Sequence, residues 1–266
     1  MIQPSGVITL LTDFGESDAY VGAMRGKILS LSRDLVIADI SHNIPQGDIA
    51  ATAFVLSQAA FCYPPGTVHC TVVDPGVGSR RAGLVVEAGE HFFVGPDNGI
   101  FTSVFGVDPL VYRIEKFQAR GRHTFHGRDL FAPVAARVAS GMDPHDVGPN
   151  HDNYVKLSWN TPVQRKDMIQ GEVIHIDGFG NLITNIEEKD LEFLGVFPNE
   201  SHLLNVEIAG RGVQGLCRTF SDKSPNTLVV YIGSAGKLEM AVRDGDAAEE
   251  LNVERKETVT CRKINK

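Results

Sequence analysis

Apolar residues in the N-terminal half of the chain alternate between two patterns. Residues 7–12 (VITLLT) form a continuous apolar and β-branched run, which is typical of a strand buried on both faces. Val21, Met24, Ile28 and Leu31 follow at spacings of three and four, which predicts an amphipathic helix. This alternation predicts an α/β fold with a mostly parallel sheet flanked by helices. The other elements predicted here are strands at 35–40, 68–73, 83–87 and 92–94 and helices at 48–60 and 130–139.

The pattern changes after residue 148, where a polar stretch with prolines and no clear period begins. We therefore predict an N-terminal α/β domain at 1–158, a linker at 159–170 and a C-terminal domain at 171–266. Short β-rich runs dominate the last part and indicate a smaller β-barrel-like domain. Its predicted elements are strands at 171–176, 203–208, 227–231 and 238–242 and a helix at 187–194.

The composition argues against several classes of function. Asp and Glu total 33 against 25 Lys and Arg, and the resulting net charge of −8 opposes binding to nucleic acid. No apolar run approaches the ~20 residues of a membrane helix. Residues 1–6 (MIQPSG) lack the basic start and apolar stretch of a signal peptide. We therefore expect a cytoplasmic protein without nucleic-acid or membrane partners.

Cysteine and histidine positions give no sign of a metal site. The four cysteines are scattered without a CxxC pair, which fits neither a zinc site nor a disulfide framework. His123 and His126 have helical spacing, but no known metal-binding signature surrounds them. We predict no metal.

Candidate binding residues follow the predicted strands, because ligands bind at the carboxyl ends of parallel strands. Asp13 comes directly after the strand at 7–12, where a carboxylate can accept two hydrogen bonds from a ribose diol. Asp18 lies just before the first predicted helix and can cap it. On local sequence alone, both aspartates are also explained as turn and cap residues.

The loop after the third predicted strand begins with Asp74 and ends in Arg80 and Arg81. Its proline and glycines predict a tight turn with open backbone amides. His126 precedes the last helix of the α/β domain, which Asp129 can cap and whose N-terminus favours a neutral imidazole. A structural salt bridge and a structural histidine are the ordinary explanations. Because the Asp, Arg and His all lie on strand-end loops of one sheet, we expect them to be able to converge on one crevice.

Small-residue loops characterise the C-terminal part. Residues 176–185 place Phe179 and Asn181 among glycines, and these side chains can stack on a planar base and read its edge. Ser234 and Ala247 lie in two further loops of small residues, which allow a ligand to approach the backbone closely. Taken singly, each loop is better explained as a barrel corner.

Six motifs together resemble one family, the S-adenosyl-L-methionine (SAM) hydrolases that form adenosine, also called SAM hydroxide adenosyltransferases and related to fluorinase and chlorinase. The resemblance extends from about Val7 to Leu251 and keeps the order of all the motifs. They are LLTDFGESDAYVGAMRG, VVDPGVGSRR, VGPDNGIFT, TFHGRDLFAPVAA, HIDGFGNLITNI and IGSAGKLEMAV.

The resemblance implies a specific activity and assembly. The family has an α/β domain and a β-barrel-like domain, and it forms homotrimers with active sites between the N-terminal domain of one subunit and the C-terminal domain of the next. Water attacks C5′ of the adenosyl group and releases adenosine and L-methionine, and no metal or organic cofactor takes part.

The resemblance also assigns residues. The family's Asp–Arg–His triad falls on Asp74, Arg81 and His126, with Arg80 as an adjacent alternative, and Asp13 matches the ribose-binding carboxylate. Asp74 and His126 are expected to accept hydrogen bonds from the attacking water. The other substrate-binding positions are Asp18, Asp177 and Ser234 around methionine and Phe179 and Asn181 around adenine, and we add Ala247.

Two other functions remain open from the sequence. A non-catalytic SAM- or adenosine-binding protein needs Asp13, Phe179 and Asn181 but has no use for the triad. A SAM halogenase is disfavoured because a charged Asp74 repels a halide anion. Turnover of SAM distinguishes the first alternative, and the identity of the product distinguishes the second.

Overall fold

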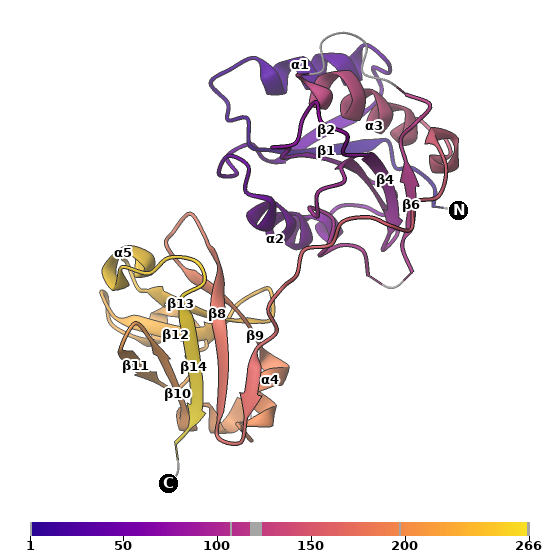
Figure 1. Ribbon diagram of the computed structural model, residues 1–266. Coiled ribbons are helices and arrows are strands. Elements are labelled where there is room, and N and C mark those ends of the chain that lie inside the picture. Colours follow the sequence, from indigo (N-terminus) through magenta and orange to yellow (C-terminus); the bar gives the residue numbers. More distant parts are fainter. Residues whose placement is uncertain (1, 107, 118–123, 197, 265–266) are drawn as a thin grey trace. The chain divides into compact units, whose positions relative to one another are not determined.

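The chain forms two compact units, residues 1–157 and 158–266 (Figure 1).

All helices of the described residues fall short of the length and apolarity that a membrane span requires. Within the same residues, no group of three or more His, Cys, Asp or Glu side chains is arranged to hold a metal ion. His123 lies outside the described part. The computed structural model describes residues 2–106, 108–117, 124–196 and 198–264.

The N-terminal unit contains a six-stranded sheet in the order β2-β1-β3-β5-β4-β6. The first four strands of that order run parallel, and β4 pairs antiparallel with both β5 and β6. The predicted α/β class is confirmed, while the edge strand β6 was not predicted. The elements are β1 (Val7–Thr12), α1 (Tyr20–Leu29), β2 (Val36–Ser41), α2 (Ile49–Ala59), η1 (Ala60–Cys62), β3 (Val68–Val72), β4 (Gly83–Ala88), β5 (His91–Pro96), β6 (Leu110–Arg113), η2 (Gly127–Phe131), α3 (Ala132–Ala139) and η3 (Pro144–Val147).

Helices cover both faces of this sheet, as Figure 1 shows for α1 and α3 on one side and α2 on the other. Ile8 and Leu10 of β1 pack with Met24 of α1 in one core, whereas Leu11 packs with Leu56 of α2 in the opposite one. A strand buried on both faces is what its unbroken apolar run predicts. The carboxyl ends of β1, β2 and β3 meet at one edge of the sheet, so the loops that follow them are neighbours.

Both predicted aspartate caps in this unit are wrong. Helix α1 begins at Tyr20 with Ala19 at the cap position, so Asp18 lies one residue too early to bind the free amides of the first turn. Asp129 falls inside the π-helical turn η2, which precedes α3, and its carboxylate binds the neighbouring Arg128 through two contacts of 2.7 Å. The added helical turn moves the start of the helical segment to Gly127.

A buried pair of histidines lies inside the N-terminal sheet. His69 Nδ1 is 2.7 Å from Thr9 Oγ1, and His69 Nε2 is 3.2 Å from Nδ1 of His91. His69 is fully buried and its ring stacks on Phe93, with the ring centres 5.0 Å apart. Burial, reinforced by the nearby His91, lowers the pKa of His69 to about 3.

We expect this histidine to make the N-terminal unit acid-sensitive. A histidine in the unfolded chain has a pKa of about 6.5. As the pH falls from about 6.5 towards 3, the unfolded state therefore binds a proton that the folded state does not bind, and this favours unfolding. At pH 5 the lost stability amounts to about 2 kcal/mol. Calorimetric melting at pH 7 and pH 5 should therefore show a smaller acid-induced drop in Tm for His69→Gln than for the wild type. His202→Gln, which changes an exposed histidine, is the control, and equal drops in all three proteins contradict the prediction.

The C-terminal unit is an antiparallel, nearly closed barrel-like sheet in the order β11-β10-β14-β8-β9-β13-β12, with β7 paired to β8. The Cys217 amide, just after β11, donates to the Val230 carbonyl of β12 at 2.7 Å and so links the two ends of that order. The β-barrel-like prediction is confirmed. The elements are β7 (Val163–Arg165), β8 (Met168–Ile176), β9 (Leu182–Glu187), α4 (Glu188–Phe193), η4 (Pro198–Leu203), β10 (Leu204–Ile208), β11 (Arg211–Gln214), η5 (Phe220–Asp222), β12 (Leu228–Ile232), β13 (Lys237–Val242), α5 (Ala247–Leu251) and β14 (Thr258–Lys263).

Two segments expected to be irregular contain strands. Strand β7 and the start of β8 fall within 159–170, where Val163 pairs with Gln170 across a tight hairpin. Strand β9 (Leu182–Glu187) begins within the predicted loop at 176–185 and takes up its last four residues, because Leu182 is fully buried between β8 and β13. In both places the partner strand supplies the hydrogen bonds, and a short run of residues carries little sign of that partner.

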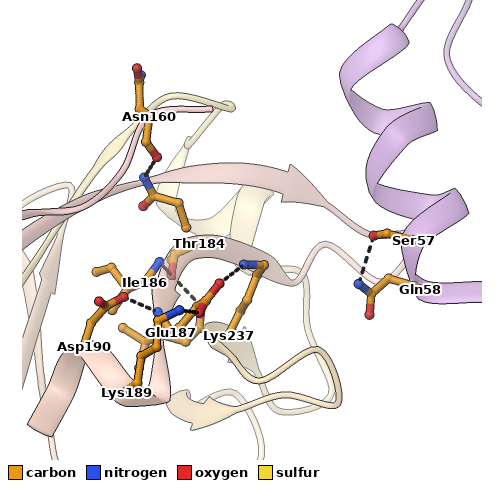
Figure 2. Close-up of polar contacts among 11 residues, drawn as sticks. Ser57, Gln58, Asn160, Thr184, Ile186, Glu187, Lys189, Asp190 and Lys237 are labelled. Carbon is orange, nitrogen blue, oxygen red and sulfur yellow. Dashed lines mark hydrogen bonds and ion pairs between the residues drawn. The ribbon is translucent and has the colours of Figure 1, made fainter. Parts of the chain in front are cut away.

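Ion pairs and caps attach α4 to the barrel (Figure 2). The Glu187 carboxylate lies 2.6 Å from Lys189 Nζ and 3.2 Å from Nζ of Lys237 on β13. These cations, Lys189 first, lower the pKa of Glu187. The Glu187 amide donates to the Asp190 carboxylate at 2.8 Å, which caps the helix. These ion pairs and the helix cap stabilise the corner, which contains none of the residues predicted for a site.

Candidate active site

Asp74, Arg81 and His126 form one hydrogen-bonded group in the N-terminal unit. Asp74 comes two residues after the end of β3, Arg81 lies near the end of the same loop seven positions later, and His126 immediately precedes η2. Arg81 Nε donates to Asp74 Oδ1 at 2.8 Å, while Nη2 donates to Asp74 Oδ2 and, at 2.8 Å, to His126 Nδ1. The structure therefore brings these three predicted residues together.

Arg81, and not its neighbour Arg80, occupies the centre of this group. The Arg81 side chain is only 10% exposed, whereas Arg80 points to solvent. Arg81 Nη1 also donates to the Ala82 carbonyl at 3.0 Å, and its guanidinium lies 5.0 Å from the centre of the Phe131 ring. These contacts fix the plane of the guanidinium, so its donors face both the carboxylate and the imidazole.

The hydrogen bonds assign the proton on His126. A guanidinium has only donors, so the Nδ1 atom that faces Arg81 must be the acceptor. A neutral His126 ring then carries its proton on Nε2. Asp74, with a side chain only 4% exposed, has both oxygens bound by Arg81, yet each carboxylate oxygen can accept a second hydrogen bond. In this group Asp74 is an acceptor and the Nε2 atom of His126 is a donor, so the expectation that His126 accepts a hydrogen bond from the water is wrong: Arg81 already occupies its acceptor atom.

This group borders a cavity of about 540 Å³ at the carboxyl edge of the sheet, called here the N-terminal cavity. Asp13, Asp74 and His126 line it together with the rings of Phe14 and Tyr20. A volume of this size, with a few converging polar groups beside aromatic rings, is typical of a small-molecule site.

Asp13 reaches the N-terminal cavity from the end of β1. Its Oδ2 accepts a hydrogen bond of 2.8 Å from the amide of Gly47, and none of the described residues donates a hydrogen bond to its Oδ1. Gly47 has a φ of +72°, and a Cβ there would lie 3.3 Å from Pro75 Cγ, so the turn favours glycine. The carboxylate is therefore held by backbone in a fixed position at the cavity wall.

Three aromatic rings form one wall of the cavity, and the sequence analysis did not predict this wall. The ring of Phe125 contacts Phe14 and Tyr20 edge-on, with ring centres 5.7 and 5.2 Å apart, and Tyr20 is 51% exposed. The three residues come from the β1–α1 loop, the start of α1 and the segment before η2. Asp18 lies close in sequence but is exposed and does not line the cavity.

In the C-terminal unit, Asp177 organises the loop between β8 and β9. Its Oδ1 accepts the amides of Phe179 and Asn181, and its Oδ2 accepts the side-chain amide of Asn181, each at 2.9 Å. The loop presents the Phe179 ring with 80% of its surface exposed, while Asn181 is nearly buried. An apolar ring held outward by a fixed loop is suited to stacking on a planar ligand.

Two further predicted positions lie in other loops of this unit. Ala247 is the first residue of α5 and is fully buried, and the neighbouring Ala248 amide donates to the Gly180 carbonyl at 3.1 Å. Helix α5 therefore supports the Phe179 loop. Ser234 is exposed in the turn between β12 and β13.

The sequence did not point to Glu239 and Tyr231, which lie near Asp177. Burial raises the pKa of the Glu239 carboxyl; its hydrogen bond to Tyr231 opposes this rise, and the charge of Asp177 adds to it. Burial and the same hydrogen bond raise the pKa of Tyr231. A protonated Glu239 would reduce the repulsion between the two carboxyl groups at this loop.

Comparison with known protein families gives the same match for both units. Residues 8–148 match the N-terminal domain of the SAM hydroxide adenosyltransferases, and residues 171–260 match the C-terminal domain of the same family.

Individual relatives agree with this match. An (R)-S-adenosyl-L-methionine hydrolase from Salinispora arenicola is 37% identical, over 92% of this chain and 94% of its own, and one from Thermus thermophilus is 35% identical, over 92% and 95%. A fluorinase from Actinoplanes sp. is more distant, at 26% identity over 97% of both chains. The crystal structure of an uncharacterized conserved protein from Thermotoga maritima superposes with a TM-score of 0.88 at 33% identity, covering 96% of this chain and all of the other.

Proposed function

The chain belongs to the SAM hydroxide adenosyltransferase family and hydrolyses SAM to adenosine and L-methionine, and we propose that Asp74, Arg81 and His126 hold the attacking water in the N-terminal cavity. One observation carries the proposal. The buried Arg81 binds Asp74 and His126 at the same time, and both of these residues line the cavity that Asp13 also borders.

The chemistry needs an oriented nucleophile more than an acid. The positive sulfonium leaves as a neutral thioether, taking the electron pair of the broken C5′–S bond, so no group has to protonate it. The water oxygen must lie in line with that bond, about 3–3.5 Å from C5′. His126 Nε2–H donates to the water oxygen and Asp74 accepts one of its protons, which fixes the direction of attack.

The proton balance suits a paired carboxylate. As the new O–C5′ bond forms, the attacking oxygen becomes an alkyl oxonium, which is a much stronger acid than a carboxylic acid. The proton therefore passes to the Asp74 carboxylate. Arg81 holds the two partners in place and balances the charge of Asp74 before the reaction.

The adenosyl and methionine groups have proposed partners in both units. Asp13 accepts the ribose hydroxyls, and the resemblance assigns Phe179 and Asn181 to adenine. Asp177 then acts through its hold on the Phe179 loop. The proposal retains Asp18 and Ser234 for methionine, Ala247 as a support of the same loop, a homotrimeric assembly and a cytoplasmic location.

A turnover assay in labelled water tests the function. Purified protein incubated with SAM in ¹⁸O-enriched water should yield L-methionine and adenosine with the label in its 5′ hydroxyl. Calorimetry with adenosine on the same preparation measures binding separately. Tight binding without product favours a non-catalytic binder, and a halogenated nucleoside formed in added fluoride or chloride favours a halogenase; either result contradicts the proposal.

A further inference from the structure

A buried histidine outside the triad contacts the strand that carries Asp13. His42 follows β2 and is 2% exposed, and its Nδ1 lies 2.8 Å from Thr12 Oγ1, the last residue of β1. On the other side of the ring, Nε2 lies 3.0 Å from Asp39 Oδ1. This second contact is electrostatic, because the carboxylate is not aligned for a straight hydrogen bond. Arg25 of α1 forms an ion pair with the same aspartate.

Two hydrogen bonds from backbone amides join the loops that carry these residues. The Gly15 amide donates to the His42 carbonyl at 2.8 Å, and the Gly47 amide donates to Asp13 Oδ2 at 2.8 Å. The segment that follows β2 therefore holds the β1–α1 turn before, at and after Asp13. Each contact is short, and together they leave the Asp13 backbone little freedom to rotate.

The pairing of β1 with β2 places His42 for this contact. Leu10 pairs with Asp39, but the next residue, Leu11, pairs with Ser41, so the ladder shifts by one position. Such irregularities re-aim the residues that follow them and occur often beside active sites. Here the shift sets the register of the residues that lead from β2 to His42.

The protons in this chain of contacts can be assigned. A lone pair on His42 Nε2 would be repelled by the Asp39 carboxylate 3.0 Å away, so Nε2 carries the proton. Nδ1 of the neutral ring is then an acceptor. The Thr12 hydroxyl then donates to His42, and its oxygen accepts the Phe14 amide at 3.3 Å. The arrangement resembles a hydroxyl–imidazole–carboxylate triad, but Thr12 is fully buried and no substrate can reach its oxygen.

We propose that His42 is a positioning residue for Asp13. With Asp39 behind it, His42 fixes Thr12 and the β1–α1 turn, and so sets where the Asp13 carboxylate meets the ribose. This inference rests on the proposed binding of ribose by Asp13. A carboxylate that binds two hydroxyls at once tolerates little displacement, because both hydrogen bonds weaken together.

The chain supplies a matched control. Thr9 of the same strand makes the same contact with another buried histidine, His69, at 2.7 Å, but it is three residues from Thr12, towards the amino end of β1. Thr12→Val and Thr9→Val each remove one hydroxyl at nearly constant volume. Both variants should lose stability, and only Thr12→Val should lose affinity for adenosine.

The test compares these variants by calorimetry with adenosine and by steady-state kinetics with SAM. We expect Thr12→Val and His42→Ala to raise the adenosine Kd and the KM for SAM about tenfold, the lower end of what loss of an outer supporting partner costs at a metal site. The kcat should change less. His42→Asn, whose amide oxygen can still accept from Thr12, should recover much of the affinity. Thr9→Val and His69→Ala should keep the wild-type Kd.

Each other outcome is decisive. If Thr12→Val and Thr9→Val have the same adenosine affinity while Asp13→Ala loses it, His42 has only a structural role. If Asp13→Ala itself keeps the wild-type affinity, the ribose assignment is wrong, whatever His42 does. Should Thr12→Val and His42→Ala not fold, Asp39→Asn changes a partly exposed side chain and must raise the adenosine Kd, and an unchanged value overturns the proposal.

Discussion

Asp74→Asn is expected to lower kcat for SAM hydrolysis by about 10²–10⁴, which is what the loss of a positioned acceptor commonly costs. The amide keeps the shape of the buried carboxylate but cannot take the proton of the attacking water. His126→Asn should cause a loss of similar size, because it keeps an oxygen near Nδ1 for Arg81 and removes only the Nε2 donor. Adenosine affinity should stay within about twofold in both variants.

The double variant and the two arginines make this prediction sharper. If the residues hold one water as a unit, Asp74→Asn with His126→Asn costs little more than the worse single change. Strictly additive losses in activation free energy would show that they act separately. Arg81→Ala should also lose turnover, while Arg80→Ala, a change at an exposed side chain, should not. A loss of turnover in Arg80→Ala alone would show that Arg80, and not Arg81, belongs to the triad.

Asp13→Ala is expected to weaken adenosine binding about tenfold to a hundredfold. A hydrogen bond to a charged group contributes about 1.5–3 kcal/mol, and this change removes the proposed contact with the ribose diol. SAM should lose affinity by a similar factor because it carries the same ribose. Calorimetry with adenosine measures the effect directly.

Two variants separate binding from folding in this experiment. Asp13→Asn keeps an oxygen for the Gly47 amide but loses the charge, so it should bind adenosine more tightly than Asp13→Ala and less tightly than the wild type. Asp34→Ala removes an exposed carboxylate after α1 and should leave affinity unchanged. Equal affinity of the wild type and Asp13→Ala would refute the ribose assignment.

The sequence by itself determined the fold class and most of the elements. The unbroken apolar run of β1 and the three- and four-residue spacing of α1 follow from burial on two faces and on one face, which local patterns record. The Asp13, Asp74 and His126 positions were also visible, because ligands bind where parallel strands end. The six motifs pointed to the family that the comparisons then gave.

Only the tertiary structure decided which side chains meet. The resemblance favoured Arg81 but left the adjacent Arg80 as an alternative, and the direction of the turn into β4 buries Arg81 and exposes Arg80. His42 and His69 are 27 positions apart in sequence, yet each contacts a threonine of β1, because strand register sets their partners. Register, burial and partner strands depend on contacts between residues distant in sequence, and a local pattern of residue types holds no record of them.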